Sequence, residues 1–222
     1  MKMNVAIDGP AGAGKSTIAK KIAADIGFVY VDTGAIYRTL ALACIKEGIN
    51  SSEEEKINEI CRKTNVEIKY EDGEQKMFLN GEEVNHLIRT EEVSRMTSSI
   101  SVYKGVRDEL LDLQREIAKK ENVIMDGRDI GSFVLPDAQV KIYLTASVKT
   151  RAKRRYLEQT EKGIECTLEE IEKDIEERDF RDMNRDIAPL TETEDSIRVD
   201  SSDMTIEQVV ETIEKIIKEK EI

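Results

Sequence analysis

The sequence predicts an α/β fold in which a five-stranded parallel sheet is flanked by helices. Five short apolar or β-branched segments have the composition of buried strands, at residues 3–7, 28–32, 123–126, 140–145 and 197–200. Segments with apolar residues at helical spacing separate them, which is the alternation of a doubly wound parallel sheet. A glycine-rich loop at residues 9–14 follows the first strand, where this class of sheet binds phosphates.

Length and composition describe one domain with a heavily solvated surface. The chain has 222 residues, of which 39% are hydrophobic and 36% charged. No apolar run approaches the roughly 20 residues of a membrane span, and no signal segment opens the chain, so we expect a cytoplasmic protein without a membrane partner. A formal net charge of -12 argues against nucleic acid as a partner. Cys44, Cys61 and Cys166 are odd in number and far apart, which favours packing roles over disulfides or a zinc site.

The segment from Gly9 to Thr17 fits the phosphate-binding pattern G-x-x-x-x-G-K-[ST] in full. Small residues allow backbone N–H groups to wrap a polyphosphate at the positive end of the following helix. Lys15 supplies a mobile cation for the β- and γ-phosphates, and the Ser16 hydroxyl is a candidate Mg²⁺ ligand. The predicted nucleotide-binding residues are Gly9, Pro10, Ala11, Gly12, Ala13, Gly14, Lys15, Ser16 and Thr17. The motif alone does not define the reaction, since kinases, GTPase switches and ATP-driven motors share it.

The second strand, residues 28–32, ends at an acidic residue and leads into a helix over residues 35–45. Because ligands bind beyond the carboxyl ends of parallel strands, we expect Asp32 and Thr33 to face the phosphate loop. Arg38 lies in the first turns of this helix. It is either a candidate for holding a second phosphate or a surface ion-pair residue.

Residues from about 51 onward change character and predict a small antiparallel insertion on the substrate side. Ser51 or Ser52, with an acidic residue three positions later, resembles a capping box that opens a polar helix to about residue 63. Alternation at residues 66–70, a turn at 71–73 and a strand at 75–79 followed by Asn-Gly predict a hairpin. His86, the only histidine, has no second ligand or nucleophile spaced around it and is expected on the surface.

Two helices are expected after residue 90. The second has an apolar stripe at residues 106, 110, 113 and 117, which leaves Arg107 off the stripe. The hydroxyl-rich segment 94–101 either recognises polar edges of a ligand or is a solvated helix face. The strand at 123–126 again ends in an acidic residue, so Asp126 or Asp129 is a candidate to act through Mg²⁺ or its waters.

Charge density is highest between the fourth and fifth strands. Arg151, Arg154 and Arg155 lie together, and Arg178 follows near the end of a helix that a capping box opens at Thr167. Basic clusters are usually solvated faces, but the glycine punctuation here is typical of a lid that closes on phosphates. The last helix, after residue 205, has the spacing of a docked amphipathic helix, and we assign it no chemistry.

This set of residues favours phosphoryl transfer to a phosphate acceptor, which needs positioning and positive charge more than a strong base. Arginines hold a phosphate bidentately. A GTPase switch would carry an N-K-x-D sequence, which Asn184-Arg185-Asp186 does not match. A motor ATPase would be longer or repeated, and a nucleic-acid translocase conflicts with the acidic balance. The sequence therefore predicts a small-molecule kinase.

Four segments together resemble the bacterial cytidylate kinases, at residues 9–17, 32–38 (DTGAIYR), 126–131 (DGRDIG) and 177–190. The resemblance covers essentially the whole chain. It implies a P-loop kinase that spans residues 1–222, with a monophosphate-binding insertion at about 60–95 and a helical lid at about 150–165. It also implies transfer of a phosphoryl group from ATP to CMP or dCMP with Mg²⁺. The lack of an obvious exposed apolar stripe favours a monomer.

The resemblance also implies a role for each candidate side chain. Arg38, Arg128 and Arg185 would hold the acceptor phosphate, while Ser98, Arg107 and Asp129 would read cytosine and Arg178 with Asp182 would contact the sugar. Arg154 and Arg155 would bring charge to ATP, and with Lys15, Arg128 and Arg185 they form the catalytic set. Cytosine offers an amine donor beside two acceptors, and uracil reverses part of this pattern, so weaker use of UMP is expected. Thr33 stands where many relatives have serine, which adds a methyl group beside the substrate.

Overall fold

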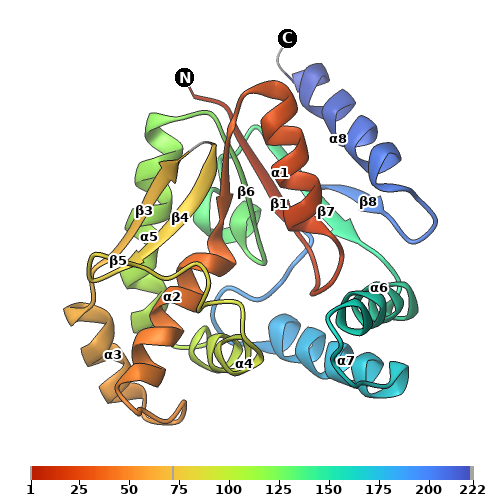
Figure 1. Ribbon diagram of the computed structural model, residues 1–222. Helices are drawn as coiled ribbons and strands as arrows, with labels where there is room; N and C mark the ends of the chain where they lie inside the picture. The colour runs from red at the N-terminus through yellow and green to blue at the C-terminus, as the bar shows by residue number, and fades with distance from the viewer. Residues whose placement is uncertain (1, 72, 221–222) are drawn as a thin grey trace.

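A computed structural model describes residues 2–71 and 73–220 (Figure 1). In chain order the elements are β1 (Asn4–Asp8), α1 (Lys15–Ile26), β2 (Val29–Asp32), α2 (Thr33–Lys46), α3 (Glu54–Lys63), β3 (Val66–Glu71), β4 (Glu74–Leu79), β5 (Glu82–Glu83), α4 (Glu91–Ile100), α5 (Lys104–Lys120), β6 (Val123–Gly127), the π-helical turn η1 (Ile130–Val134), β7 (Val140–Thr145), α6 (Val148–Glu161), α7 (Leu168–Asn184), β8 (Ile197–Asp200) and α8 (Ile206–Lys220).

The central sheet has five parallel strands in the order β2-β6-β1-β7-β8, which confirms the predicted fold class. The strand order reverses direction at β1, so the loop after β1 opens at the point where such sheets bind ligands. The register places Asp8 opposite Gly127, and Asp32 opposite Asp126. The carboxyl ends of three strands therefore bring acidic residues to one edge, as the sequence predicted.

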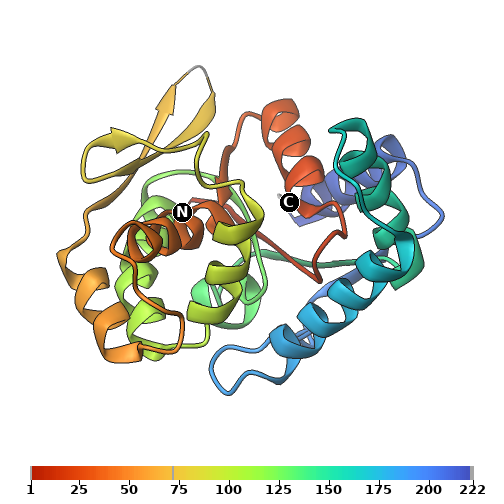
Figure 2. The ribbon, with the colours of Figure 1, turned by 60° about the horizontal axis from the view of Figure 1, so that its bottom comes forward.

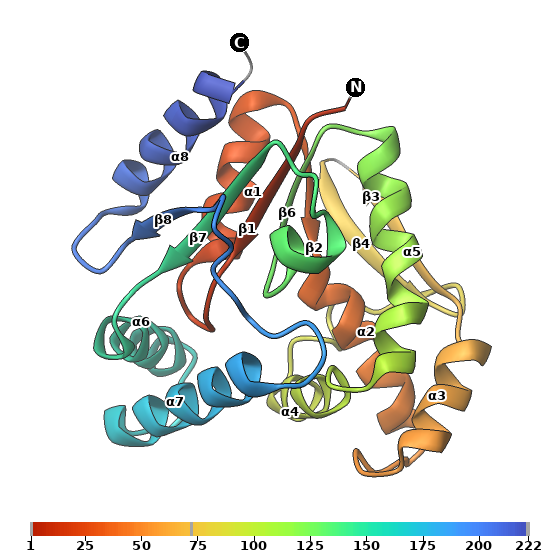
Figure 3. The ribbon, with the colours of Figure 1, turned by 180° about the vertical axis from the view of Figure 1, so that it is seen from behind.

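Helices cover both faces of this sheet, and the strand residues alternate between them (Figures 1 and 3). Val5, Ile7 and Ile124 pack with α1 and α8, whereas Ala6 and Met125 pack with α2, α5 and the turn η1. Burial on both sides explains why these strands are continuous apolar runs. Side chains of α8 fill one face only, which agrees with a docked amphipathic helix.

The insertion forms a separate three-stranded antiparallel sheet, β3-β4-β5. The predicted hairpin is present, although Asp72 of its turn lies outside the described residues. The third strand, Glu82–Glu83, pairs with β4 across residues 80–81, which confirms the tight turn predicted at Asn-Gly, although two charged residues carry no strand pattern of their own. The predicted capping box at residue 51 or 52 is wrong. The Ser52 hydroxyl donates to Asn50 Oδ1 instead (2.9 Å), and α3 begins at Glu54 without a side-chain cap.

Other local predictions are confirmed. Thr167 forms a capping box with Glu170 at the start of α7, and Thr205 and Gln208 bond reciprocally before α8. Cys44 and Cys61 are buried in the larger core cluster, and His86 is exposed. None of the helices in residues 2–71 and 73–220 is long and apolar enough to cross a membrane.

Candidate active site

A cleft of about 940 Å³ opens beyond the carboxyl ends of β1, β2 and β6. The helix α4 borders it on one side, and α6 and α7 on the other, with the loop before α1 between them (Figure 2). Every site residue predicted from the sequence lines this cleft except Gly9 and Pro10. The topology thus gathers side chains that are far apart in the chain, such as Lys15 and Arg185, which are 170 positions apart.

The phosphate loop has the backbone geometry that its small residues permit. Gly12 and Gly14 have positive φ angles of 76° and 88°, and α1 begins directly after them at Lys15. Gly9 lies at the base of the loop, where a β-carbon would meet the carbonyl oxygen of Leu144 at 1.9 Å. The Pro10 carbonyl accepts a hydrogen bond from Lys15 Nζ (2.8 Å). Gly9 and Pro10 therefore support the loop and do not line the cleft.

Lys15 is buried among other cations. Burial and the nearby guanidinium of Arg128 lower the pKa of its amine to about 7, and Arg178 acts in the same direction while Asp126 opposes it. Such a group gains most from an anion, because an anion both restores its charge and screens its positive neighbours. The electrostatics at the loop are those of a polyphosphate site.

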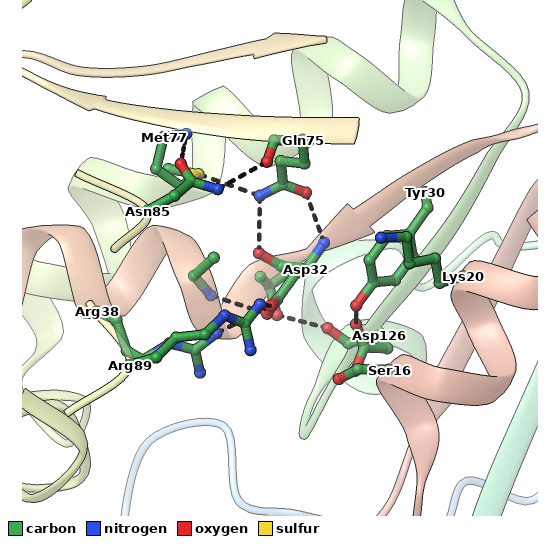
Figure 4. Close-up of polar contacts among 12 residues, drawn as sticks. Ser16, Lys20, Tyr30, Asp32, Arg38, Gln75, Met77, Asn85, Arg89 and Asp126 are labelled. Carbon is green, nitrogen blue, oxygen red and sulfur yellow. Dashed lines mark hydrogen bonds and ion pairs between the residues drawn. The ribbon is translucent and has the colours of Figure 1, made fainter. Parts of the chain in front are cut away.

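Three oxygen-bearing side chains meet at the foot of the loop. Asp126 accepts hydrogen bonds from Ser16 Oγ and from the Tyr30 hydroxyl, both at 2.9 Å (Figure 4). Burial, followed by the charge of Asp32, raises the pKa of the Asp126 carboxyl to about 6. A hydroxyl and a carboxylate in contact suit Mg²⁺, which prefers oxygen ligands and needs only one or two from the protein when phosphates and waters complete its shell. No cluster of three or more His, Cys, Asp or Glu side chains with metal-binding geometry occurs among the described residues.

Asp32 lies at the end of β2 and collects several polar contacts beside the cleft (Figure 4). Its carboxylate accepts from the backbone N–H of Ala35 at the start of α2 and from the guanidinium of Arg38 (2.9 Å). Arg89 reaches the same carboxylate at 3.3 Å, with 68% of its side chain exposed. Arg38 is thus an ion-pair residue that also lines the cleft, and its role in holding a second phosphate stays a prediction. Arg89 was not predicted, since an arginine in an irregular segment carries no distinguishing pattern.

Gln75 of β4 connects the insertion to this site. Its side-chain oxygen accepts from the Asp32 backbone N–H (2.8 Å), and its side-chain nitrogen donates to the Asp32 carbonyl (3.2 Å). Asn85 in turn donates to the Gln75 carbonyl (3.0 Å), as Figure 4 shows. Thr33 follows Asp32, and its hydroxyl donates to the Asp126 carbonyl (2.7 Å), so β2 and β6 are joined beside the cleft. No sequence signal pointed to Gln75.

A buried ion-pair cluster surrounds Asp129. Its two carboxylate oxygens accept from Arg107, which is only 2% exposed, and from Arg185 (3.3 Å). Ser98 Oγ and Arg107 Nε are buried nearby without a hydrogen-bond partner among the described residues. Buried polar atoms cost free energy unless they are paired, so these two donors are suited to a polar ligand in the cleft.

Arg128, Asp182 and Arg178 form a second ionic group that lines the cleft. Arg128 Nε donates to Asp182 (2.9 Å), and Arg178 Nε is buried without a partner in the described chain. Burial and the charge of Arg128 lower the pKa of Arg178 to about 10. A guanidinium with an unpaired nitrogen and like-charged neighbours favours binding of an anion or a sugar hydroxyl.

The arginines of α6 divide into structural and available side chains. Arg151 is buried, pairs with Asp179 at 2.6 Å and donates to the Ala11 carbonyl, so it stabilises the phosphate loop. The sequence had placed it among the lid residues that close on phosphates. Arg154 donates to the carbonyl of Ser201 (2.7 Å). Arg155 lines the cleft and makes no hydrogen bond or ion pair within the described residues.

Comparison with known proteins gives one consistent result. A profile of the family described as cytidylate kinase matches residues 5–219. A cytidylate kinase of Lactobacillus gasseri is 50% identical over 219 residues, which cover 99% of this chain and 95% of that protein. One from Bacillus cereus is 43% identical over 216 residues, 97% of this chain and 96% of the relative. Among solved structures, shikimate kinase from Acinetobacter baumannii in complex with shikimate matches with a TM-score of 0.50 and 16% identity, covering 100% of this chain and 96% of that one. That likeness supports the fold alone.

Proposed function

This chain belongs to the cytidylate kinase family, and from that premise we propose that its cleft transfers the γ-phosphoryl group of ATP to CMP or dCMP, giving ADP and CDP or dCDP. The observation that carries the proposal is the density of positive charge at the cleft centre. Arg128 and Arg178 lower the pKa of Lys15. The pKa of Arg178 is in turn lowered by the charges of Arg128, Arg155 and Arg38. The triphosphate of ATP and the monophosphate of CMP or dCMP would supply the negative charge that this arrangement lacks.

In the proposed mechanism the phosphate loop and Lys15 hold the ATP phosphates, and Arg38, Arg128 and Arg185 hold the acceptor phosphate. The reacting oxygen of CMP is already anionic, so no residue needs to act as a strong base. The chain's main contribution is to hold donor and acceptor in line and to surround the transferred group with cations. Lys15 and Arg128 lie close enough to influence each other, which allows both to contact the transferred group.

The proposed base recognition uses the ion-pair cluster at Asp129. Its carboxylate accepts from the exocyclic amine of cytosine, while the unpaired donors of Ser98 and Arg107 serve the base acceptors. Arg178 and Asp182 line the same cleft and would contact the sugar. Uracil places an acceptor where cytosine has its amine, so UMP would leave polar groups unpaired at a cost of about 1–3 kcal/mol each.

Mg²⁺ bound with ATP would be held through the Ser16 hydroxyl and by Asp126, directly or through waters. When bound, it neutralises charge on the transferred phosphoryl group. We also propose that the insertion at about 60–95 binds the monophosphate acceptor and that a lid at about 150–165 brings Arg154 and Arg155 to ATP. The enzyme would be a monomer in the cytoplasm, where its nucleotide substrates are dissolved.

The test is release of ADP from ATP and Mg²⁺, measured with CMP, dCMP, UMP, AMP, GMP or shikimate, and with no acceptor. CMP and dCMP should accelerate release far above the rate without acceptor, with UMP clearly weaker. If shikimate or AMP is preferred, or if no acceptor increases the rate, the proposal is refuted.

A further inference from the structure

The π-helical turn η1 follows Asp129 directly and is held at both ends by charged side chains. At its first residues the Asp8 carboxylate accepts from the backbone N–H groups of Ile130 (2.8 Å) and Gly131 (2.7 Å). At its last residues Arg115 donates to the carbonyl oxygens of Val134 (2.9 Å) and Phe133 (3.0 Å). An anion at the N–H end and a cation at the C=O end match the polarity of a helical turn.

Asp129 is tied into the same unit. Its carbonyl oxygen accepts from the backbone N–H groups of Phe133 and Val134, and its carboxylate binds Arg107 and Arg185. Arg107 and Arg115 both come from α5, which packs along η1 on the face of the sheet opposite α1 (Figure 3). One helix therefore holds both the side chain of Asp129 and the turn that carries it.

Asp8 and Arg115 do not line the cleft, so neither is placed to touch a ligand there. Asp8 is 6% exposed and immediately precedes Gly9, the first residue of the phosphate loop. The turn is packed closely, because a β-carbon at Gly131 would lie 3.1 Å from the side chain of Lys141. π-Helical turns are rare and are frequently found at functional sites.

We propose that Asp8 and Arg115 are positioning residues that hold Asp129 in place for recognition of the acceptor's base. The inference rests on the proposed function, in which Asp129 accepts from the cytosine amine. Recognition by hydrogen bonds depends on alignment within about 0.5 Å, and a carboxylate on an unsupported turn loses that alignment. Asp8 also links the proposed base-binding and ATP-binding parts of the cleft, because it bonds to the turn η1 and lies one position before the phosphate loop.

The experiment compares Arg115→Met with Arg115→Lys, which keeps one donor, and with Lys119→Met. Lys119 lies on the same helix, is 70% exposed and pairs only with Glu116 among the described residues, so it is a matched control. For Arg115→Met we expect KM for CMP to rise about tenfold and the ratio of kcat/KM for CMP over UMP to fall at least fivefold, with KM for ATP within about twofold. Arg115→Lys should recover part of the loss, and Asp8→Asn should reproduce the change in ratio.

Hydrogen exchange of the peptide covering residues 129–135 provides a readout that does not depend on the substrate. Exchange should be faster in Arg115→Met and in Asp8→Asn than in the unmodified protein or in Lys119→Met. Unchanged exchange overturns the proposal, as does a normal CMP preference in both variants or an equal rise of KM for ATP and CMP. An unmodified protein that does not use CMP refutes the proposed function instead, and with it the role of these residues in base recognition.

Discussion

Binding of ATP should draw a proton onto Lys15, and the number of protons can be worked from the site. Burial and neighbouring arginines lower the pKa of Lys15 to about 7, so at pH 8 this amine is about 90% neutral before nucleotide binds. Phosphate oxygens at hydrogen-bond distance favour the charged amine and return its pKa toward the usual value of about 10.4. ATP binding at pH 8 should therefore take up about 0.9 proton, and affinity should fall by nearly tenfold per pH unit above pH 7.

ATP binding is linked to proton uptake by Lys15, so its pH dependence has the opposite sign to that of a group that releases a proton when ATP binds. Below pH 7 Lys15 is already charged, so uptake through this group vanishes, and above pH 7 each bound nucleotide must also bind a proton. Asp126, whose pKa is raised to about 6, is almost fully ionised at pH 8 and contributes little there.

Titration calorimetry with a non-hydrolysable ATP analogue, in buffers of different ionisation enthalpy, measures the uptake directly. Lys15→Met is the control, because it removes the amine and leaves other titrating groups such as Asp8 in place. The uptake by the unmodified protein should exceed that of the variant by about 0.9 proton at pH 8. A difference below about 0.2 proton would refute the account of Lys15 as a buried amine held among cations. In steady-state assays the same variant should lose most phosphoryl transfer without unfolding.

Three further predictions follow from the contacts at the cleft. Asp129→Ala should reduce kcat/KM for CMP by at least about 100-fold while ATP affinity stays within about threefold, because the proposed role of the carboxylate is to bind the base of the acceptor. Equal losses in kinetics and in ATP titrations would assign Asp129 a structural role. Arg155→Met should lower turnover by about 10–100-fold with an unchanged melting temperature. Arg154→Met should also lower the melting temperature, since only Arg154 bonds to Ser201. Matching melting curves for the two variants would contradict this difference. Gln75→Ala should lower the free energy of unfolding by about 1–2 kcal/mol and raise KM for CMP, because it removes both hydrogen bonds to the Asp32 backbone. Denaturant unfolding indistinguishable from that of the unmodified protein would contradict this prediction.

The sequence predicted those parts of the fold and site that depend on local patterns. Short segments of the sequence are sufficient to predict the phosphate loop, the five strands and the acidic residues at strand ends. Asp32 and Asp126 could be placed together because parallel strands bring their carboxyl ends to one edge of the sheet. The resemblance to a known family then supplied roles for side chains such as Arg107, whose helical position alone marked it only as lying off an apolar stripe.

The roles of Asp8 and Gln75 were missed because they depend on pairings between distant segments. Asp8 precedes the phosphate loop, but nothing near it indicates that its carboxylate would meet the amides of Ile130 and Gly131, more than 120 positions away. In the sequence Gln75 is one of several polar residues of a hairpin, and only the contact of β4 with β2 in the folded chain shows its role. The failed cap before α3 has a local cause, because Asn50 competes for the Ser52 hydroxyl and offers the backbone a tight turn.

The side-chain attachment of the insertion has a consequence for solubility. β2 is an edge strand of the main sheet, and its outer groups are covered by Tyr70, which donates to the Tyr30 carbonyl, and by Gln75 on both backbone groups of Asp32. Exposed edges of this kind pair with other chains and promote aggregation. Deleting the insertion to give a shorter chain would thus expose this strand edge and also remove the proposed monophosphate-binding insertion. Loss of activity in such a deletion would therefore report self-association as much as the loss of catalytic residues.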